Sequence, residues 1–330
     1  MNTLENMTPP SLSSPPAPSG RWGPSNCLRR LSDGVRSTFT FATLLVIAQA
    51  CTLAAHSQSV TVSAAGDIAC SLTRSAGTDH CQMAATAALV AGKGVDAVLT
   101  LGDNQYSRGR YGAYQDSYDP TWGRFRDITY PVPSDHEYMT PQAEGYYQYF
   151  GEAAGDPQRG YYSFDLGSWH IIALNSNCRE VGGCGEGSPQ LDWLRRDLAE
   201  HPSKCTLAYW HHPRFSSGRH GGDSDYQAFW QALYQAGADV VLAGHDHHYE
   251  RFAPQTPSGE ADPNGGLREF VVGTGGKSFY EAQRDVANSE VIGLDAFGVL
   301  FLNLRKDGYS WSFESATGSS FRDAGRDSCH

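Results

Sequence analysis

Aspartate and histidine side chains recur directly after short apolar segments of this sequence. They are Asp67, Asp103, Asp135, His211 and the pair His245 and His247. Because ligands bind at the carboxyl ends of strands in open α/β sheets, we expect these side chains to meet at one edge. Carboxylate and imidazole groups together are ligands for hard and borderline divalent metal ions. The pattern therefore predicts a metal site whose ligands come from five separate segments.

A purely structural role is the alternative for each motif taken singly. An Asp that follows a Gly, as in Gly66-Asp67 and Gly102-Asp103, often accepts backbone N–H groups within a turn. Turn formation does not explain why five segments end in the same residue types. In Gly244-His245-Asp246-His247, strand alternation places both histidines on one side if the strand continues through them. We therefore favour metal binding.

The apolar segments that precede these residues have the pattern of β-strands. Strands are predicted at 59–65, 95–101, 129–133, 161–166, 169–175, 206–210, 238–243, 269–273, 299–304 and 309–314. Helices are predicted at 82–90, 189–200 and 226–235, the second with Ser188 as its N-cap. Helices between the early strands, followed by a run of strands, indicate an α/β (α+β) fold. We expect a four-layer αββα sandwich of two packed mixed β-sheets with flanking helices.

The first 55 residues differ in composition from the rest. Residues 37–55 contain no charge, three arginines (Arg29, Arg30 and Arg36) precede them, and small residues follow the apolar core. This order is typical of a secretory signal peptide, so we expect residues 1–55 to be a removed leader and residues 56–330 a single exported domain. A membrane anchor is the alternative, although threonines interrupt a run barely long enough to span. Lipid attachment at Cys51 is a second alternative.

Charge and cysteine content narrow the class of protein further. The chain has 25 basic and 36 acidic residues and a net charge of −11. This balance argues against general binding of nucleic acids or anionic membranes. Six cysteines follow residue 55, and in an exported chain they predict three disulfides. Proximity along the chain alone favours Cys70–Cys81 and Cys178–Cys184, which leaves Cys205–Cys329.

Taken in order, the motifs resemble those of the calcineurin-like metallophosphoesterases and, within them, the purple acid phosphatase branch. The motifs are Gly66-Asp67, Gly-Asp-Asn-Gln-Tyr at 102–106, Ser-Asp-His-Glu at 134–137, His-His-Pro at 211–213 and the histidine motif at 244–247. Tyr106 and the run Tyr249-Glu250-Arg251 carry the match to the purple acid phosphatases. The resemblance covers about residues 58–315 and implies a binuclear metal centre between two β-sheets.

The resemblance also implies a role for each residue. The first metal ion would be bound by Asp67, Asp103, Tyr106 and His247, and the second by the bridging Asp103 with Asp135, His211 and His245. A phenolate is a hard donor, which suggests Fe³⁺ at the first site; the second site would hold Zn²⁺, Mn²⁺ or Fe²⁺. His136 would contact the phosphate or the leaving group. His220 would lie on the substrate side, or would simply be an exposed loop residue. We expect His212 and His248 behind the ligands or on the surface.

Such a centre implies that a metal-bound hydroxide attacks the phosphorus of a phosphate ester. We expect an exported phosphomonoesterase that acts on small phosphorylated substrates. A phosphodiesterase or nucleotidase on the same fold is one alternative. The other is a weakly active metal- or phosphate-binding homologue, because Asp135 stands where the family has Asn. The added negative charge predicts altered metal preference and weaker catalysis. Ser134, which replaces a family Gly, would strain the turn if its φ were positive. The sequence leaves the substrate and the oligomeric state open.

Overall fold

The computed structural model describes residues 59–70, 81–280, 284–316 and 318–330. The chain divides into two compact units, Met1–His56 and Ser57–His330, and every described residue belongs to the second. The predicted leader and Cys51 therefore lie outside the described residues. Within the described ranges, no helix combines the length and the apolar character that crossing a membrane requires.

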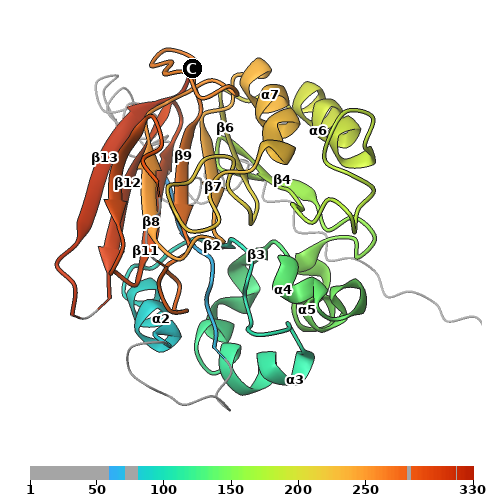
Figure 1. Cartoon of the computed structure of the whole chain (residues 1–330), viewed down its shortest axis with the longest axis vertical. Coiled ribbons are helices and arrows are strands. Elements are labelled where there is room, and N and C mark those ends of the chain that lie inside the picture. Colours follow the sequence, from blue (N-terminus) through green and yellow to red (C-terminus); the bar gives the residue numbers. More distant parts are fainter. Residues whose placement is uncertain (1–58, 71–80, 281–283, 317) are drawn as a thin grey trace, which may run out of the picture. The chain divides into compact units, whose positions relative to one another are not determined.

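Two mixed β-sheets form the centre of the unit (Figure 1). The six-stranded sheet has the order β13-β12-β11-β1-β2-β3. Its strands are β1 (Val60–Ala65), β2 (Ala97–Thr100), β3 (Thr129–Pro131), β11 (Gly298–Arg305), β12 (Gly308–Ser315) and β13 (Arg322–Ser328). Strands β1, β2 and β3 are parallel, whereas β11, β12 and β13 pair antiparallel. The carboxyl ends of β1, β2 and β3 therefore lie at the same edge.

The second sheet has seven strands in the order β10-β8-β9-β7-β6-β5-β4. They are β4 (Tyr162–Leu166), β5 (Trp169–Ala173), β6 (Cys205–Tyr209), β7 (Val240–Ala243), β8 (Tyr249–Phe252), β9 (Arg268–Val272) and β10 (Ser289–Gly293). The four central strands β5, β6, β7 and β9 are parallel. Backbone hydrogen bonds from Gly66 N to Val272 O and from Gly275 N to Gly66 O join the end of β1 to the end of β9. The two sheets thus meet where their parallel strands end.

Side-chain alternation along the seven-stranded sheet separates two apolar cores. Leu207 and Tyr209 of β6 join the same core as Val62 of β1 and Leu99 of β2. The intervening Ala208 belongs to a second core. That core also contains residues of α6 (Pro189–Glu200) and α7 (Gln227–Gln235), which lie together beside this sheet in Figure 1. One face of each strand therefore packs toward the other sheet and one toward the helices. The predicted sandwich of two mixed sheets with flanking helices is confirmed.

The remaining helices are short and follow the strands of the six-stranded sheet. They are α2 (Met83–Ala91), α3 (Tyr111–Ala113), α4 (Asp135–Tyr138) and α5 (Glu144–Phe150), with a π-helical turn at Tyr114–Tyr118 and 3₁₀ turns, the longest at Trp122–Ile128. The three predicted helices correspond to α2, α6 and α7 within one residue at each end. Ser188 caps α6, because its hydroxyl accepts a hydrogen bond from Leu191 N at 3.3 Å.

Three strands were missing from the sequence-based prediction, namely β8, β10 and β13. Strand β13 reads Arg-Asp-Ala-Gly-Arg-Asp-Ser and has no apolar alternation. It is a strand because all seven of its residues pair with β12. This pairing is not indicated by any pattern within the segment itself. The three predicted disulfides are all formed, and Cys205–Cys329 ties the start of β6 to the residue after β13.

Candidate metal centre

The predicted ligand residues follow the carboxyl ends of five parallel strands and converge between the sheets. Asp67 follows β1, Asp103 follows β2, and His245 follows β7 in sharp turns, where their φ angles are +58°, +47° and +70°. Asp and His tolerate this left-handed conformation better than bulkier side chains. Gly102 permits the close approach, because a Cβ atom there would lie 2.6 Å from His211 Nδ1. Local turn chemistry and the parallel strands together bring these side chains to one place.

The first group of donors comprises Asp67, Asp103 and His247, with Tyr106 beside them. Ligand atoms of the first three lie within 4.8 Å of one another. His247 Nε2 is 3.1 Å from Asp67 Oδ1 and 3.0 Å from the Tyr106 hydroxyl, which also donates to Asp67 Oδ1 at 2.7 Å. All four side chains are buried. The group combines carboxylate, imidazole and phenol donors.

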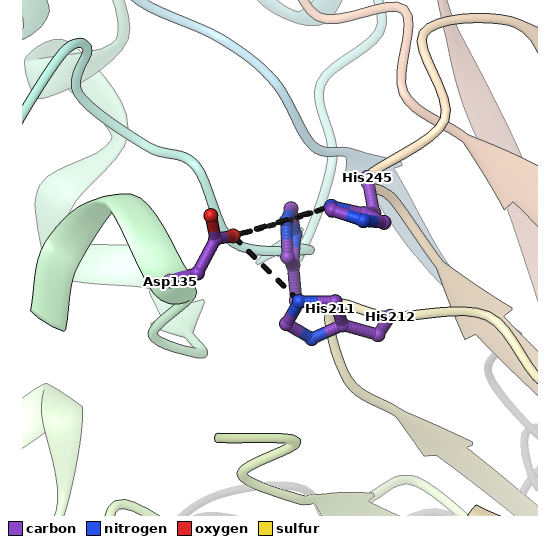
Figure 2. A group of neighbouring side chains, drawn as sticks. All are labelled: Asp135, His211, His212 and His245. Atoms are coloured by element: carbon purple, nitrogen blue, oxygen red, sulfur yellow. Dashed lines mark hydrogen bonds and ion pairs between the residues drawn. The ribbon is translucent and has the colours of Figure 1, made fainter. Parts of the chain in front are cut away.

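The second group of donors comprises Asp135, His211, His212 and His245, again with ligand atoms within 4.8 Å. Figure 2 shows the carboxylate of Asp135 directed toward the imidazole rings. Asp135 Oδ1 is 3.4 Å from His211 Nε2, 3.7 Å from His212 Nε2 and 4.0 Å from His245 Nδ1. Asp103 connects the two groups, since its Oδ1 lies 3.6 Å from His211 Nε2.

Backbone carbonyl groups orient two of the imidazoles. His211 Nδ1 donates to Leu101 O at 2.7 Å, and His247 Nδ1 donates to Ser278 O. A proton held on Nδ1 leaves the Nε2 lone pair directed into the cluster, which is the usual arrangement of a metal-binding histidine. This feature distinguishes His211 and His247 from histidines that merely pack in a core.

The electrostatics of the cluster are those of a site built for cations. Burial and the charges of Asp67 and Asp135 raise the pKa of Asp103 to about 7, although His211 and His136 act in the opposite direction. Burial lowers the pKa of His211, but the charges of Asp103, Asp67 and Asp135 outweigh it and raise this pKa to about 10. In addition, Asp135 Oδ1 is a buried oxygen without a hydrogen bond. Metal ions would neutralise these crowded carboxylates and satisfy the orphaned oxygen, so the donor set fits them.

Ser134 does not strain its turn, because the condition for strain, a positive φ, is not met. Its φ of −128° and ψ of −176° are extended, so the position does not require Gly. Instead, Ser134 caps α4, and its hydroxyl contacts Asp103 Oδ1 and Glu137 Oε2. Glu137 also accepts hydrogen bonds from Gln105 N at 3.2 Å and the Tyr114 hydroxyl at 3.1 Å. The buried carboxylate of Glu137 therefore connects the 102–106 and 134–137 motifs through hydrogen bonds.

The two histidines predicted to act on the substrate both border the cluster. His136 Nδ1 bonds to Ser107 O at 2.8 Å, and its Nε2 lies 3.7 Å from Asp103 Oδ2. The His220 ring lies 4.3 Å, centroid to centroid, from that of His245, yet the residue is exposed. His248 lies behind the cluster and bonds to Glu250 at 3.0 Å. The geometry thus brings every predicted site residue together.

The strand does not continue through 244–247, so strand alternation does not apply to the two histidines. Strand β7 ends at Ala243, and the positive φ of His245 turns the chain. His245 and His247 consequently enter different donor groups and do not share one side of a strand. The resemblance in motif order implied this division of the two histidines between two metal ions, whereas strand alternation did not. The turn that separates them also depends on contacts with β1, such as His245 N to Asp67 Oδ2 at 2.9 Å.

Three further residues at the site had no assigned role or only a vague one from the sequence. His212 faces Asp135 directly, and its Nδ1 bonds to the Ser176 hydroxyl at 2.8 Å. Asp246 is fully buried and accepts hydrogen bonds from the loop that carries His220. Tyr280 stacks on His247 with ring centroids 3.9 Å apart. Asp246 was visible within the 244–247 motif, whereas no local pattern marks Tyr280.

Comparison with known proteins identifies similar sequences. The model of the family described as Calcineurin-like phosphoesterase matches residues 64–249, which include every predicted metal ligand. Purple acid phosphatase 15 of Arabidopsis thaliana is 32% identical over 183 residues, or 49% of this chain and 33% of that protein. Purple acid phosphatase 22 of the same plant is 26% identical over 221 residues, or 58% of this chain and 47% of that protein. The chain thus spans only a third to a half of the length of these relatives.

Two solved structures share the fold. The purple acid phosphatase PPD1 from yellow lupin (Lupinus luteus) seeds has a TM-score of 0.62 at 17% identity and covers 83% of this chain and 54% of that chain. GAP50, the anchor in the inner membrane complex of Plasmodium, has a TM-score of 0.58 at 14% identity, with 82% and 89% covered. At such low identity these similarities concern the fold alone.

Proposed function

Because the chain belongs to the calcineurin-like phosphoesterase family and its relatives include purple acid phosphatases, we propose that this metal-dependent phosphoesterase is an exported, two-metal phosphomonoesterase. The observation that carries the proposal is the pair of donor groups that meet at Asp103. Two adjacent groups of oxygen and nitrogen donors suit two cations at a shared carboxylate. A pocket of about 460 Å³, lined in part by Asp135 and His212, adjoins the second group and is compatible with small substrates.

We assign the first donor group and Tyr106 to one metal ion, and the second donor group without His212 but with the shared Asp103 to the other. Asp67, Asp103, Tyr106 and His247 would hold the first ion, and Asp103, Asp135, His211 and His245 the second. Burial and the neighbouring carboxylates Asp103 and Asp67 raise the pKa of Tyr106, so only a strongly charged cation would ionise this phenol. We therefore assign Fe³⁺ to the first site. The oxygen and nitrogen donors of the second suit Zn²⁺, Mn²⁺ or Fe²⁺.

When bound, two such ions polarise a phosphate ester and lower the pKa of the attacking water. The protein's own groups bind the ester and move protons. His136 is oriented by its Nδ1 contact with Ser107 O and presents Nε2 beside Asp103, where it can donate a proton to the leaving oxygen. His220 would contact the substrate from the side of His245.

Export is supported by the disulfides and by the predicted signal peptide. The structure pairs all six cysteines that follow residue 55. Disulfides of this kind form and persist in oxidising compartments outside the cytosol. We propose that residues 1–55 are removed during export and that residues 56–330 form the working domain.

Hydrolysis of 4-nitrophenyl phosphate by the metal-loaded protein, measured from acid to alkaline pH, tests the function. Asp103→Asn suits the backbone φ of +47° better than Ala and should lower kcat/KM by at least about a hundredfold. Asp127→Ala, at an exposed position, is the matched control and should retain full activity. A visible charge-transfer band of the iron-loaded protein that Tyr106→Phe removes would support the Fe³⁺ assignment.

The alternative outcomes are distinct. Faster hydrolysis of bis(4-nitrophenyl) phosphate than of the monoester would indicate a diesterase on the same site. A folded protein that binds two metal ions per chain but hydrolyses neither ester would contradict the proposed function.

A further inference from the structure

A pocket adjoins the candidate metal centre on the side of the second donor group. It has a volume of about 460 Å³ and shares Asp135 and His212 with that group. Figure 2 shows both residues at the cluster. An ester whose phosphate binds at the donor groups can therefore extend its leaving alcohol into this pocket. Its chemistry should then select among substrates.

The wall of the pocket is preformed and aromatic. Tyr226 is buried, its hydroxyl donates to Ser176 O at 2.9 Å, and its ring stacks near that of His212 with centroids 5.9 Å apart. Ser176 also holds His212 through the 2.8 Å contact with Nδ1. The Cys178–Cys184 disulfide closes the loop that carries Arg179 and Glu180, which also line the pocket. A rigid aromatic wall favours binding of an apolar or cationic group.

The charge of the pocket favours a cation. Apart from Asp135, the pocket is lined by three acidic residues and one basic residue, which are Glu180, Asp223, Asp225 and Arg179. Asp223 and Asp225 both act electrostatically on the Tyr226 hydroxyl, so their charges reach the aromatic wall. Glu180 acts in the same way on Tyr138, another lining residue. Negative charge therefore exceeds positive charge along the lining of the space that the leaving group would enter.

Cationic side chains gather at the other side of the centre. The Lys277 ammonium lies 5.3 Å from the centroid of the Tyr106 ring. The Arg219 guanidinium lies 5.3 Å from the centroid of Tyr280, which stacks on His247. Positive charge thus flanks the first donor group, and negative charge lines the pocket beside the second. Such a division is complementary to a molecule that is anionic at one end and cationic at the other.

We infer that this pocket is a leaving-group site for phosphomonoesters of small amino or quaternary ammonium alcohols. The inference rests on the proposed function and specifies its substrate class. In the reaction, the bond between phosphorus and the alcohol oxygen breaks, water forms the new bond to phosphorus, and the departing oxygen takes up a proton. The products are inorganic phosphate and the cationic alcohol. Nucleoside di- and triphosphates and polyphosphates, whose leaving groups are anionic, are poor substrates.

Phosphocholine and 3,3-dimethylbutyl phosphate provide a direct test, because their leaving groups have the same shape and differ by one positive charge. A single carboxylate about 8 Å away in a solvent-like medium favours a cation by roughly two- to fivefold. With an excess of two carboxylates, kcat/KM for phosphocholine should exceed that for the neutral ester by at least about fivefold at low salt. The ratio should decrease as salt is added.

The double variant Glu180→Gln, Asp225→Asn removes that excess at two exposed positions and should bring the ratio close to one. Glu200→Gln, at the exposed end of α6 and outside the pocket, is the control and should leave the ratio as it is. An equal ratio in wild type and double variant, no preference for phosphocholine, or faster hydrolysis of ADP than of phosphocholine would overturn the inference. If 4-nitrophenyl phosphate is hydrolysed in the same experiment, the proposed function survives that result; if no ester is hydrolysed, both fall.

Discussion

The carboxylate of Asp246 holds the loop at 216–221 against the candidate metal centre. Its Oδ2 accepts hydrogen bonds from the Ser216 hydroxyl at 2.5 Å and from Gly221 N at 3.1 Å. Its Oδ1 accepts one from His220 N at 2.9 Å. The side chain is fully buried, so water cannot replace these partners. Asp246 is therefore expected to position His220 without contacting the substrate.

Asp246→Asn preserves the size of this side chain but leaves one acceptor oxygen. In the better orientation the amide oxygen takes the place of Oδ2 and keeps two hydrogen bonds. The N–H of His220 then faces an NH₂ group and loses its partner. Loss of one charge-assisted hydrogen bond in a buried setting costs about 1.5–3 kcal/mol. For a domain of this size that corresponds to a decrease in Tm of about 3–10 °C.

Thermal unfolding followed by circular dichroism, at fixed pH and metal concentration, measures this effect. Asp156→Asn is the matched control, because Asp156 is exposed and accepts one backbone hydrogen bond, from Gln158 N at 2.9 Å. The control should change stability by no more than about 0.5 kcal/mol. Bound metal is quantified in parallel, since Asp246 adjoins His245 and His247. If Asp246→Asn and Asp156→Asn unfold at the same temperature with equal metal content, Asp246 does not hold the loop.

Two further predictions concern buried or clustered carboxylates. Asp135 lies within 4.0 Å of nitrogen atoms of three histidines, and Asp135→Asn should keep an oxygen donor while removing a negative charge. We expect kcat for 4-nitrophenyl phosphate to rise severalfold at saturating metal, and a decrease would contradict the idea that this charge weakens catalysis. Burial raises the pKa of Glu269 from its ordinary 4.5 to about 8, so the folded protein retains a proton that the unfolded chain loses above pH 4.5. The contribution of Glu269 to the free energy of unfolding therefore falls as the pH rises from about 4.5 to 8. Glu269→Gln should make Tm decline less steeply with pH in this window. An unchanged dependence of Tm on pH would show that Glu269 does not titrate there.

The layered fold was largely predictable because its signals are local. Strands β5, β6, β7 and β9 are parallel and buried, so they appear in the sequence as short apolar runs. Helix α6 has a Ser188 cap followed by a proline, which marks its start. Strand β13 has no such signal, because it lies at the edge of its sheet and four of its seven residues are charged. It forms a strand because its backbone pairs with β12, and no pattern within its own residues indicates this pairing.

The ligand residues of the candidate site and their division between two metal ions were predictable from the motifs, but the residues that hold them in place were not. Residue types at strand ends, together with a resemblance in motif order, indicated Asp67, Asp103, Tyr106, His211 and His247. The residues that support them, such as Glu137 under the two turns and Asp246 under the 216–221 loop, act through partners in distant segments. Neither spacing nor hydropathy encodes a contact of that kind.

The sequence by itself determined which side chains stand at the ends of the strands, since β-strand periodicity and Gly-Asp turns are properties of neighbouring residues. The resemblance in motif order already implied separate metal ions for His245 and His247 and a shared Asp103. Only the tertiary structure decided the distances within the two donor groups, the turn at His245 and the acidic aromatic pocket that opens beside Asp135. These features arise where the ends of two different sheets meet. Their geometry is therefore fixed by the packing of the sheets against each other, which no single segment of the chain contains.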